Sequence, residues 1–536
     1  MAIKKSIPRA KTPGNVGVSA KVVGEFLKEA GKRHLEYHSL MVIRDGKVAV
    51  EWYNEPYNKE SKHSVYSVSK SFTATAIGFA IDEGLITLDT KVLDIFPDYP
   101  PRHKDERFEK LTIRNLLRMS SGKQPNILAE KGKIDWIKDF INSPWVFEPG
   151  EKFLYVNENI YMLSAIIWRV TGVNMREYLR PRLFEPLGIE VPYWDTDQNG
   201  IEAGGWGLYI KTEDLAKFTL CYANNGKFNG KQVIPEWWTK EATKQQIDNS
   251  DNGPNRDSVS GYGYCFWKNH TDKESFRADG MFCQFGISFP EYNAVVITTS
   301  GIPDEQAGLD CIWDFFPRAF EEKEDEKQAK LGEFFIEQPV YGGRSYYEPV
   351  VEDRYIKFHK KILLNIIRFP LSVLPLAVTY MMTDRAGNID MVKFRFNDTD
   401  CTIEWSEGRE KNVIPLGMDG HYRYATMRLG QTDFKVCSNA FWIDDKTLVV
   451  SIRPIETIAK RNLIFNFRYK DVVTMTPSST PSIEEISQYL MVAFEQIVPN
   501  RTICNVFQKA LNVLSPLAEP KHYGIFIEGI KHNKNK

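Results

Sequence analysis

The sequence predicts an α/β fold for about the first 325 residues, followed by a separate antiparallel β domain. Three observations lead to this interpretation. A hairpin pattern lies near the N-terminus, helical patterns follow it, and strand patterns return before residue 320. Because strands occur at both ends of this half, we expect one antiparallel sheet built from both ends, with a helical region inserted between them.

The strands of this sheet are predicted from short β-rich runs separated by turn residues. Residues Leu40 to Tyr53 form two such runs around Asp45-Gly46, a dipeptide typical of hairpin turns. Gly261 to Lys268 and Gly286 to Ser300 are the strands expected near the end of this half, the latter turning at residues 290–293. These runs supply the two sides of the sheet.

The helical region is predicted from apolar residues at helical spacing. The clearest run extends from Ser67 to Glu83 and stops at Gly84, a residue that commonly ends a helix. The other expected helices are Leu111–Met119, Trp136–Ile141, Ile160–Thr171, Met175–Phe184, Thr212–Asn224 and the closing helix Cys311–Glu321.

The composition changes after the charged run from Glu321 to Lys330, which marks a domain boundary. We expect domain 1–325, a linker over 326–375, an antiparallel β domain over 376–480, and a helical appendage over 481–536. The β domain is predicted from alternating runs such as Val392 to Phe396 and Phe465 to Tyr469. Ser482 is the expected N-cap of the appendage.

Charge and cysteine usage narrow the function classes. The formal net charge of −1 gives no electrostatic reason to expect nucleic acid as a partner. Seven scattered cysteines without a C-x-x-C pair, and no apolar h-region after Lys4-Lys5, favour a cytoplasmic protein with reduced thiols, although a trimmed signal stays an alternative. The nine histidines show neither H-x-H nor H-E-x-x-H, so no metal or other cofactor is expected.

One segment, Ile362 to Met382, is apolar enough to raise the question of a membrane span. It contains Asn365, Arg368, Pro370 and Pro375, which are costly in hydrocarbon or interrupt a helix. We therefore expect a buried linker segment and no stable span, with a peripheral membrane contact as the alternative.

The first candidate catalytic element is Ser67-Val68-Ser69-Lys70. Residues three apart on a helix share a face, so the Lys70 amine can approach the Ser67 hydroxyl and activate it as a nucleophile. The pattern is weak alone, because Ser120-Ser121-Gly122-Lys123 repeats it in turn-forming sequence. The structural alternative is that Ser67 only caps the helix while the lysine faces solvent.

The second element is Tyr155-Val156-Asn157. A tyrosine near a lysine can be partly deprotonated and act as a general base, while Asn157 positions substrate. A similar triplet occurs at Tyr222-Ala223-Asn224, and a buried tyrosine with a satisfied hydroxyl is the structural alternative.

The third element is Ala278-Asp279-Gly280-Met281, before the last strands. Glycine permits close backbone approach, so an amide at this strand edge could complete an oxyanion hole with the amide of Ser67. An ordinary turn is the alternative. We take Ala278, Gly280 and Met281 as substrate-binding candidates beside Asn157.

Together these elements resemble the class C β-lactamase-related serine hydrolases, which include penicillin-binding proteins, D-Ala-D-Ala carboxypeptidases, esterases and aminohexanoate-oligomer hydrolases. The resemblance covers about residues 15–320 and implies the α/β penicillin-recognition fold. The later β domain resembles, more loosely, the lipocalin-like, β-barrel-like domains attached to bacterial members. The blocks that carry it are Ser67-Val-Ser-Lys70-Ser-Phe-Thr-Ala, Leu116-Leu-Arg-Met-Ser-Ser-Gly122, Pro149-Gly-Glu-Lys-Phe-Leu-Tyr155-Val-Asn157 and Gly204-Gly-Trp-Gly-Leu-Tyr-Ile-Lys-Thr-Glu-Asp214.

The sequence departs from the family at the third element. Relatives have Lys-Thr-Gly or His-x-Gly where this chain has Ala278-Asp279-Gly280, so the cation that holds a substrate carboxylate is missing. Strand alternation argues against Arg277 turning into the cleft to replace it. The resemblance therefore implies cleavage of an ester or amide of a small molecule or short peptide through a Ser67 acyl-enzyme. The alternative is a slow penicillin-binding or sensor protein, and the oligomeric state, including a homo-oligomer, stays open.

Overall fold

The computed structural model divides the chain into two compact units, Met1–Ile336 and Glu337–Lys536. It describes residues 6–124, 135–271, 274–323, 341–358, 372–373, 388–429, 432–469, 471–482, 484–485, 491, 504–510, 519 and 521–527.

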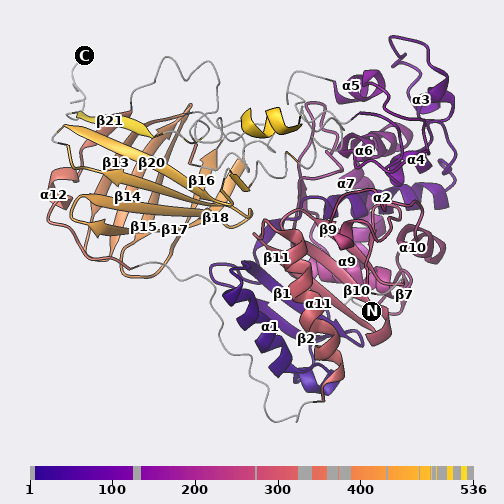
Figure 1. The fold of residues 1–536 in the computed structure, drawn as a ribbon, viewed down its shortest axis with the longest axis horizontal. Coiled ribbons are helices and arrows are strands. Elements are labelled where there is room, and N and C mark those ends of the chain that lie inside the picture. The colour runs from indigo at the N-terminus through magenta and orange to yellow at the C-terminus, as the bar shows by residue number, and fades with distance from the viewer. Residues whose placement is uncertain are drawn as a thin grey trace. The chain divides into compact units, whose positions relative to one another are not determined.

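The first unit is built on an antiparallel sheet in the order β2-β1-β11-β10-β9-β8 (Figure 1). The N-terminal strand β1 lies directly beside the late strand β11, with Met41 opposite Ile297. The expected assembly of the sheet from both ends is therefore confirmed. The strands are β1 (Tyr37–Arg44), β2 (Lys47–Tyr53), β8 (Trp267–Lys268), β9 (Phe276–Gly280), β10 (Gln284–Phe289) and β11 (Ala294–Ser300).

The hairpin of β1 and β2 turns at Asp45 and Gly46, whose φ angles of +51° and +69° lie in the left-handed region. Two such residues in a two-residue loop match the right-handed twist of the strands, which explains why Asp-Gly serves here. The predicted hairpin is confirmed, with Val42 paired to Val50.

Helices cover both faces of this sheet. α1 (Ala20–Lys32) and α11 (Glu305–Glu321) pack on one face with β1, β10 and β11 (Figure 1). α2 (Val68–Asp82) and α9 (Thr212–Ala223) belong to the core on the other face. That core also includes most of the inserted helical region: α3 (Val92–Ile95), α4 (Ile113–Leu117), α5 (Trp136–Asn142), α6 (Asn157–Thr171), α7 (Met175–Leu179), a π-helical turn (Arg180–Phe184), α8 (Glu185–Leu187) and α10 (Glu236–Thr243).

Short elements complete the unit. The strands β3 (Lys62–Ser64), β5 (Leu208–Lys211) and β4 (Tyr193–Trp194) form a small sheet in that order, and β6 (Lys227–Phe228) pairs with β7 (Lys231–Gln232). Single 3-10 turns lie at Pro13–Val16, Glu106–Glu109, Arg256–Ser258 and Pro290–Tyr292.

Two predicted elements of this unit differ most from their expected bounds. The expected strand Gly261–Lys268 is reduced to Trp267–Lys268, because Gly261 and Cys265 adopt φ angles of +117° and +63°, which break an extended strand. The closing helix begins at Glu305 and not at Cys311. Asp304 caps this helix by accepting a hydrogen bond from the Ala307 amide, a signal present in the sequence.

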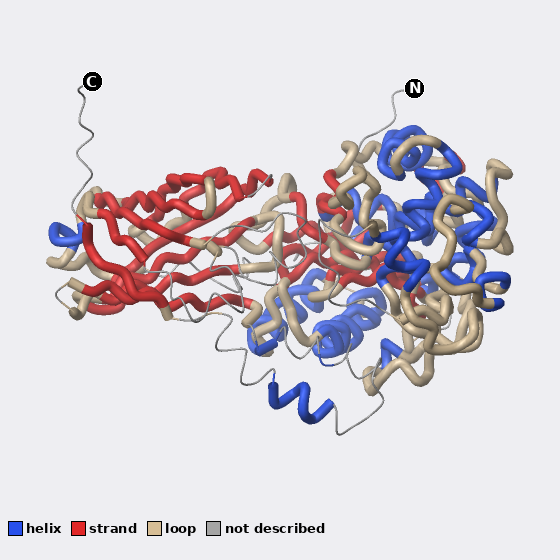
Figure 2. Tube along the Cα trace, turned by 90° about the horizontal axis from the view of Figure 1, so that it is seen from above, coloured by secondary structure: helices blue, strands red, loops and turns tan. Residues whose placement is uncertain are grey.

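The second unit is a β-barrel, in which strands predominate (Figure 2). Among its described residues, nine strands pair in the ring β15-β14-β13-β12-β21-β20-β19-β18-β17, closed by pairing of Gly417 with Asn439. β16 pairs with β17 beside this closure. The strands are β12 (Tyr355–Phe358), β13 (Ile389–Phe396), β14 (Asp400–Glu407), β15 (Glu410–Gly417), β16 (Arg423–Leu429), β17 (Thr432–Asp444), β18 (Thr447–Pro454), β19 (Lys460–Asn466), β20 (Val472–Thr480) and β21 (His522–Ile527).

Two strands lie outside the expected β region of 376–480. The segment 326–375, predicted as a linker, contains α12 (Glu348–Val351) and β12, and the predicted helical appendage 481–536 contains β21. These two short strands pair with each other, Tyr355 opposite Ile527, and complete the ring. Neither strand has a distinctive pattern of its own, because closure of the barrel supplies the pairing that stabilises it.

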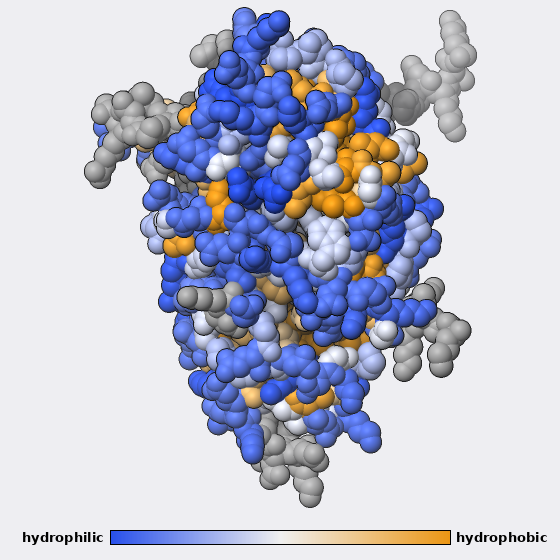
Figure 3. Space-filling view, turned by 90° about the vertical axis from the view of Figure 1, so that its right-hand side faces the viewer, coloured by the Kyte–Doolittle hydropathy of each residue, from blue (hydrophilic) through white to orange (hydrophobic). Residues whose placement is uncertain are grey.

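Of the apolar segment Ile362–Met382, the structure describes only Ser372 and Val373, both buried, and the rest lies outside the described residues. In the part of the chain that is described, no helix is both long and apolar enough to cross a membrane. Hydrophilic residues cover most of the face in Figure 3, with apolar patches between them.

Helix α2 packs so closely against α10 that the contact requires glycine. A Cβ added at Gly78 would lie 2.4 Å from Cδ2 of the buried Trp238, whereas one added at Gly31 in α1 would meet no atom within 4 Å. Replacing a helical glycine by alanine normally stabilises by up to about 1 kcal/mol.

We predict that Gly78→Ala lowers the free energy of unfolding by about 1–3 kcal/mol, the usual cost of overpacking. Gly31→Ala is the matched control and should raise it. Urea unfolding followed by tryptophan fluorescence compares the two variants, and a Gly78→Ala protein as stable as the wild type would contradict this packing.

Candidate active site

Ser67 stands at the start of α2, directly after a strained residue. Tyr66 has a φ of +45°, in the left-handed region that a bulky residue rarely adopts. Ser67 occupies the N-cap position, but its side chain makes no capping hydrogen bond. The hydroxyl is half-buried and is not used as a cap, so the structural alternative for this serine does not hold.

Lys70 is buried, with 1% of its surface exposed, and its amine points at Ser67. Nζ lies 2.8 Å from Ser67 Oγ, 2.8 Å from Asn157 Oδ1 and 2.7 Å from the carbonyl oxygen of Gly205. Asn157 is the first residue of α6, and Gly205 lies in the loop before β5. Three separate segments of the chain therefore surround one amine.

The pKa of Lys70 is lowered to about 7, because burial penalises the ammonium form. The negative charges of Glu158 and Asp279 oppose this shift without cancelling it. A lysine with this pKa is largely a free amine just above neutral pH, so it can accept a proton.

Tyr155 lies over the same amine, with Nζ 4.8 Å from the centre of its ring. Burial raises the pKa of Tyr155 well above its usual value, and a hydrogen bond with Ser67 only partly offsets this. Tyr155 is therefore a neutral phenol at neutral pH. The expected partly deprotonated tyrosine is not favoured, because the aromatic surroundings, including stacked Trp267, disfavour the charge.

The edge of β9 lies against the turn that carries Ser67. A Cβ added at Gly280 would come 2.2 Å from the carbonyl oxygen of Val65, so only glycine permits this approach. Met281 follows directly, which brings its backbone close to the start of α2. Ala278, by contrast, belongs to the apolar core with 1% of its surface exposed.

Arg277 and Asp279 form an ion pair on the other face of β9. Arg277 Nε lies 2.6 Å from Asp279 Oδ2. The other two nitrogens of the guanidinium donate to the carbonyl oxygens of Lys268 and Asp257 and to Asn269 Oδ1. The guanidinium is therefore fully engaged by these partners. Arg277 neutralises the carboxylate charge of Asp279, for which the sequence alone indicated no partner.

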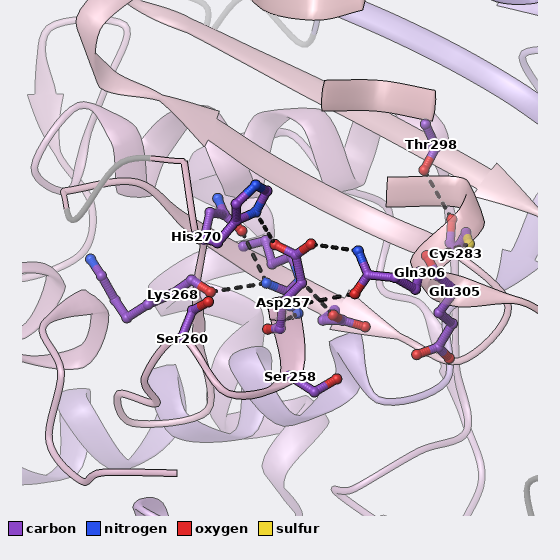
Figure 4. Close-up of polar contacts among 12 residues, drawn as sticks. Asp257, Ser258, Ser260, Lys268, His270, Cys283, Thr298, Glu305 and Gln306 are labelled. Atoms are coloured by element: carbon purple, nitrogen blue, oxygen red, sulfur yellow. Dashed lines mark hydrogen bonds and ion pairs between the residues drawn. The ribbon is translucent and has the colours of Figure 1, made fainter. Parts of the chain in front are cut away.

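A hydrogen-bond network around the buried Asp257 supports this edge (Figure 4). The carboxylate of Asp257 binds His270 Nδ1 at 2.9 Å and accepts hydrogen bonds from Gln306 Nε2 and Trp313 Nε1 at 2.8 and 3.1 Å. Next to Gln306, Glu305 accepts a hydrogen bond from the Phe282 amide at 3.2 Å. Burial, reinforced by the charge of Asp279, raises the pKa of Glu305 to about 8. α11 thereby braces the loop that contains Met281.

The repeated motifs are structural. Lys123 Nζ donates to the carbonyl oxygens of Ile141 and Ser143 and lies 3.7 Å from the centre of the Trp145 ring, while Arg118 donates to Ser120. These contacts secure a turn. The Tyr222 hydroxyl is satisfied in the core by Thr75 and Trp238.

Sequence reasoning did not assign three groups that the structure brings to the site. The Gly205 carbonyl has no side-chain signal, although a Gly204-Gly205 pair is visible in the sequence. Glu305 and Asp257 carry no motif, and only the folded chain brings them behind β9. Among the described residues, no group of three or more His, Cys, Asp or Glu side chains could hold a metal ion.

Comparison with known proteins finds several relatives of this chain. A protein 26% identical over 216 residues is an uncharacterized protein of Alkalihalophilus pseudofirmus, covering 36% of this chain and 58% of that protein. The 6-aminohexanoate-dimer hydrolase of Paenarthrobacter ureafaciens is 20% identical over 308 residues, which cover 50% of this chain and 73% of the hydrolase. Among solved structures, the octameric penicillin-binding protein homologue from Pyrococcus abyssi has a TM-score of 0.44 at 18% identity, covering 85% of this chain and 97% of that one.

Protein flp from Staphylococcus aureus is 26% identical to this chain over 177 residues, which are 30% of this chain. The chain spans 58% of the length of the Alkalihalophilus protein and 35% of the length of Protein flp. The family model described as Beta-lactamase matches residues 23–309, which include every candidate catalytic residue. That match covers more than half of the chain, and the protein therefore belongs to the beta-lactamase family.

Proposed function

We propose that the protein is a serine hydrolase that cleaves an ester or amide through an acyl-enzyme on Ser67. The observation that carries this proposal is the 2.8 Å separation of the buried Lys70 Nζ from Ser67 Oγ. A serine needs a nearby base, and a lysine needs a lowered pKa to serve as one. Both conditions are met by the same contact.

Lys70 is the proposed base. In its free-amine form, two N–H groups donate to Asn157 Oδ1 and the Gly205 carbonyl, and the lone pair faces the Ser67 hydroxyl. Lys70 then takes the Ser67 proton as Oγ attacks the substrate carbonyl. This assignment also accounts for the buried position of the amine.

Tyr155 is the proposed proton donor to the leaving group, since burial keeps it a neutral phenol next to Ser67. It recovers its proton from Lys70. The amides of Ser67 and Met281 stabilise the oxyanion, Asn157 and Gly280 shape the substrate site, and water releases the acyl group. Ala278, expected at the substrate site, lies instead in the apolar core. No cofactor enters these steps.

The proposed substrates are small esters, amides or short peptides, D-amino-acid peptides included, that do not depend on a carboxylate anchor. The residue at the usual cation position, Ala278, is apolar, and the neighbouring Arg277 is fully engaged with Asp279 and backbone carbonyls. The same feature favours a second candidate, a catalytically slow penicillin-binding or sensor protein. The rate at which an acyl label leaves Ser67 distinguishes the two: rapid release favours the hydrolase, and slow release favours the binding or sensor protein.

The remaining proposals concern context. All candidate catalytic residues lie in the first unit, so we propose that the barrel supplies none of them. The described cysteines are all free thiols, which supports a cytoplasmic location.

We predict that Ser67→Ala abolishes labelling by a fluorophosphonate and lowers ester turnover by several orders of magnitude, because it removes the nucleophile. The melting temperature should stay nearly unchanged, since the Ser67 hydroxyl caps no helix. Ser120→Ala is the matched control and should keep full labelling. Loss of labelling in Ser120→Ala alone would overturn the assignment.

The pH profile tests the base. With a Lys70 pKa of about 7, the free-amine fraction increases tenfold per pH unit below 7 and levels off above it. We therefore expect kcat/KM to rise from pH 5 to about pH 7.5. Lys70→Arg keeps a cation that does not deprotonate and should be inactive throughout. An activity that is flat between pH 5 and 7, or an active Lys70→Arg enzyme, would contradict Lys70 as the base.

Substrate charge tests the altered third element. Of two nitrophenyl esters that differ only in a carboxylate on the acyl chain, the neutral one should have the higher kcat/KM, by roughly ten- to hundredfold, since the charged hydrogen bond that would hold a carboxylate is missing. For the same reason, nitrocefin should be cleaved less efficiently than nitrophenyl acetate. Preference for the carboxylate ester would show that another cation fills this role.

A further inference from the structure

The turn that carries the proposed oxyanion amide has an unfavourable backbone. Met281, Phe282 and Cys283 join β9 to β10. Gly280 pairs with Gln284 across them. Phe282 and Cys283 have φ angles of +67° and +63°, in the left-handed region that residues with a side chain rarely adopt. Such residues persist only where the surrounding structure holds them, so the turn depends on contacts with its neighbours.

The side chain of Gln284 supplies several of these contacts. It is buried at the start of β10. Its Nε2 lies 3.3 Å and 3.0 Å from the carbonyl oxygens of Met281 and Phe282, and 2.7 Å from that of Ser300 at the end of β11. Its Oε1 accepts a hydrogen bond from the Ser300 amide at 3.2 Å. One side chain therefore ties the turn to the neighbouring strand.

Two hydroxyl groups of β11 hold the same turn. Ser300 Oγ donates to the carbonyl oxygen of Phe282 and lies 3.1 Å from that of Cys283. Thr298 Oγ1 donates to the Cys283 carbonyl at 2.9 Å (Figure 4). Both hydroxyl-bearing residues are buried, so water does not compete for these bonds. Together with Gln284, they provide a donor to each of the three carbonyl oxygens of the turn.

The turn also contacts the segment that leads to the proposed nucleophile. Before Met281, Gly280 lies so close to this segment that an added Cβ would be 2.2 Å from the Val65 carbonyl oxygen. After Met281, the Phe282 ring packs edge-on against Tyr66, with ring centres 5.3 Å apart. The amide of Met281 is therefore held between two residues that both touch this segment.

The orientation of that amide depends on the hydrogen bonds of the turn. An oxyanion donor is effective when it is already aimed at the place where negative charge develops. Relaxation of the left-handed φ angles would rotate the peptides next to Met281 and turn its N–H away. Gln284 opposes this rotation, because the carbonyl oxygens of Met281 and Phe282 must both point at its Nε2.

We propose that Gln284 is a positioning residue that fixes the Met281 amide as an oxyanion donor by tying the turn to β11. Its side chain is buried and uncharged, so it acts on the reaction only through the turn. This inference rests on the proposed function, because it assigns a support to the same site. The hydrogen bonds that hold the turn do not depend on that function.

The test compares a nitrophenyl ester with its thionoester, in which sulfur replaces the carbonyl oxygen. Sulfur is a weak hydrogen-bond acceptor, so cleavage of the thionoester gains less from the oxyanion donors. Gln284→Met keeps the size of the side chain and removes its hydrogen bonds. We expect kcat/KM to fall roughly ten- to hundredfold for the ester and less than about threefold for the thionoester.

Thr299→Val is the matched control. It removes another buried hydroxyl of β11, which bonds to Ser39 at 2.6 Å, and it should leave the ratio of the two kcat/KM values unchanged. Gln284→Glu serves if Gln284→Met does not fold, because a carboxyl group has at most one donor where the amide has two, and its ratio should also fall. An equal loss for both esters, or a wild-type ratio in the Gln284 variants, would overturn the proposal.

Hydrogen–deuterium exchange of the full chain measures the turn without a substrate. A peptide that contains residues 280–284 should exchange faster in Gln284→Met or Gln284→Glu than in the wild type, and at the wild-type rate in Thr299→Val. Unchanged exchange in the Gln284 variants would show that this side chain does not hold the turn. Failure of the wild type to cleave either ester would refute the proposed function, while the exchange rates would still decide whether Gln284 holds the turn.

Discussion

The buried amine of Lys70 is the constraint on which the rest of the site depends. Placing it within 2.8 Å of Ser67 removes an ammonium from water, and the pKa shift to about 7 is the consequence. The amine remains tolerable in the core because Asn157 and Gly205 accept its hydrogen bonds. Those two acceptors come from the start of α6 and the loop before β5, so the position of the amine depends on correct packing of the inserted helical region.

The second constraint is steric. β9 can lie against the start of α2 only because Gly280 has no side chain, and the same strand carries the ion pair of Arg277 and Asp279 on its other face. Asp257 and Gln306 tie this edge to α11. The altered third motif is therefore a stable, fully bonded strand edge. At the position where relatives have a cation, this strand has the apolar Ala278, and the neighbouring Arg277 is paired with Asp279.

A third support acts on the residues before Ser67. β9 lies against the carbonyl of Val65, and His63 Nδ1 lies 2.8 Å from the carbonyl oxygen of Ser64. The strained φ of Tyr66 persists because both neighbours are fixed.

Local patterns were sufficient for the elements whose stability is local. Asp45-Gly46 determines the first hairpin, apolar spacing determines α2, and the spacing of Ser67 and Lys70 on one helix face determines their contact. Order along the chain also indicated that the sheet is built from both ends. What the sequence did not reveal depends on contacts between distant segments. β12 and β21 become strands because the barrel needs both to close, and Gly261–Lys268 is largely not a strand because its backbone turns. Tyr155 stays protonated and Arg277 neutralises Asp279 only once the chain is folded. The charge state and the burial of a side chain depend on the groups packed around it, and only the tertiary structure determines which groups those are.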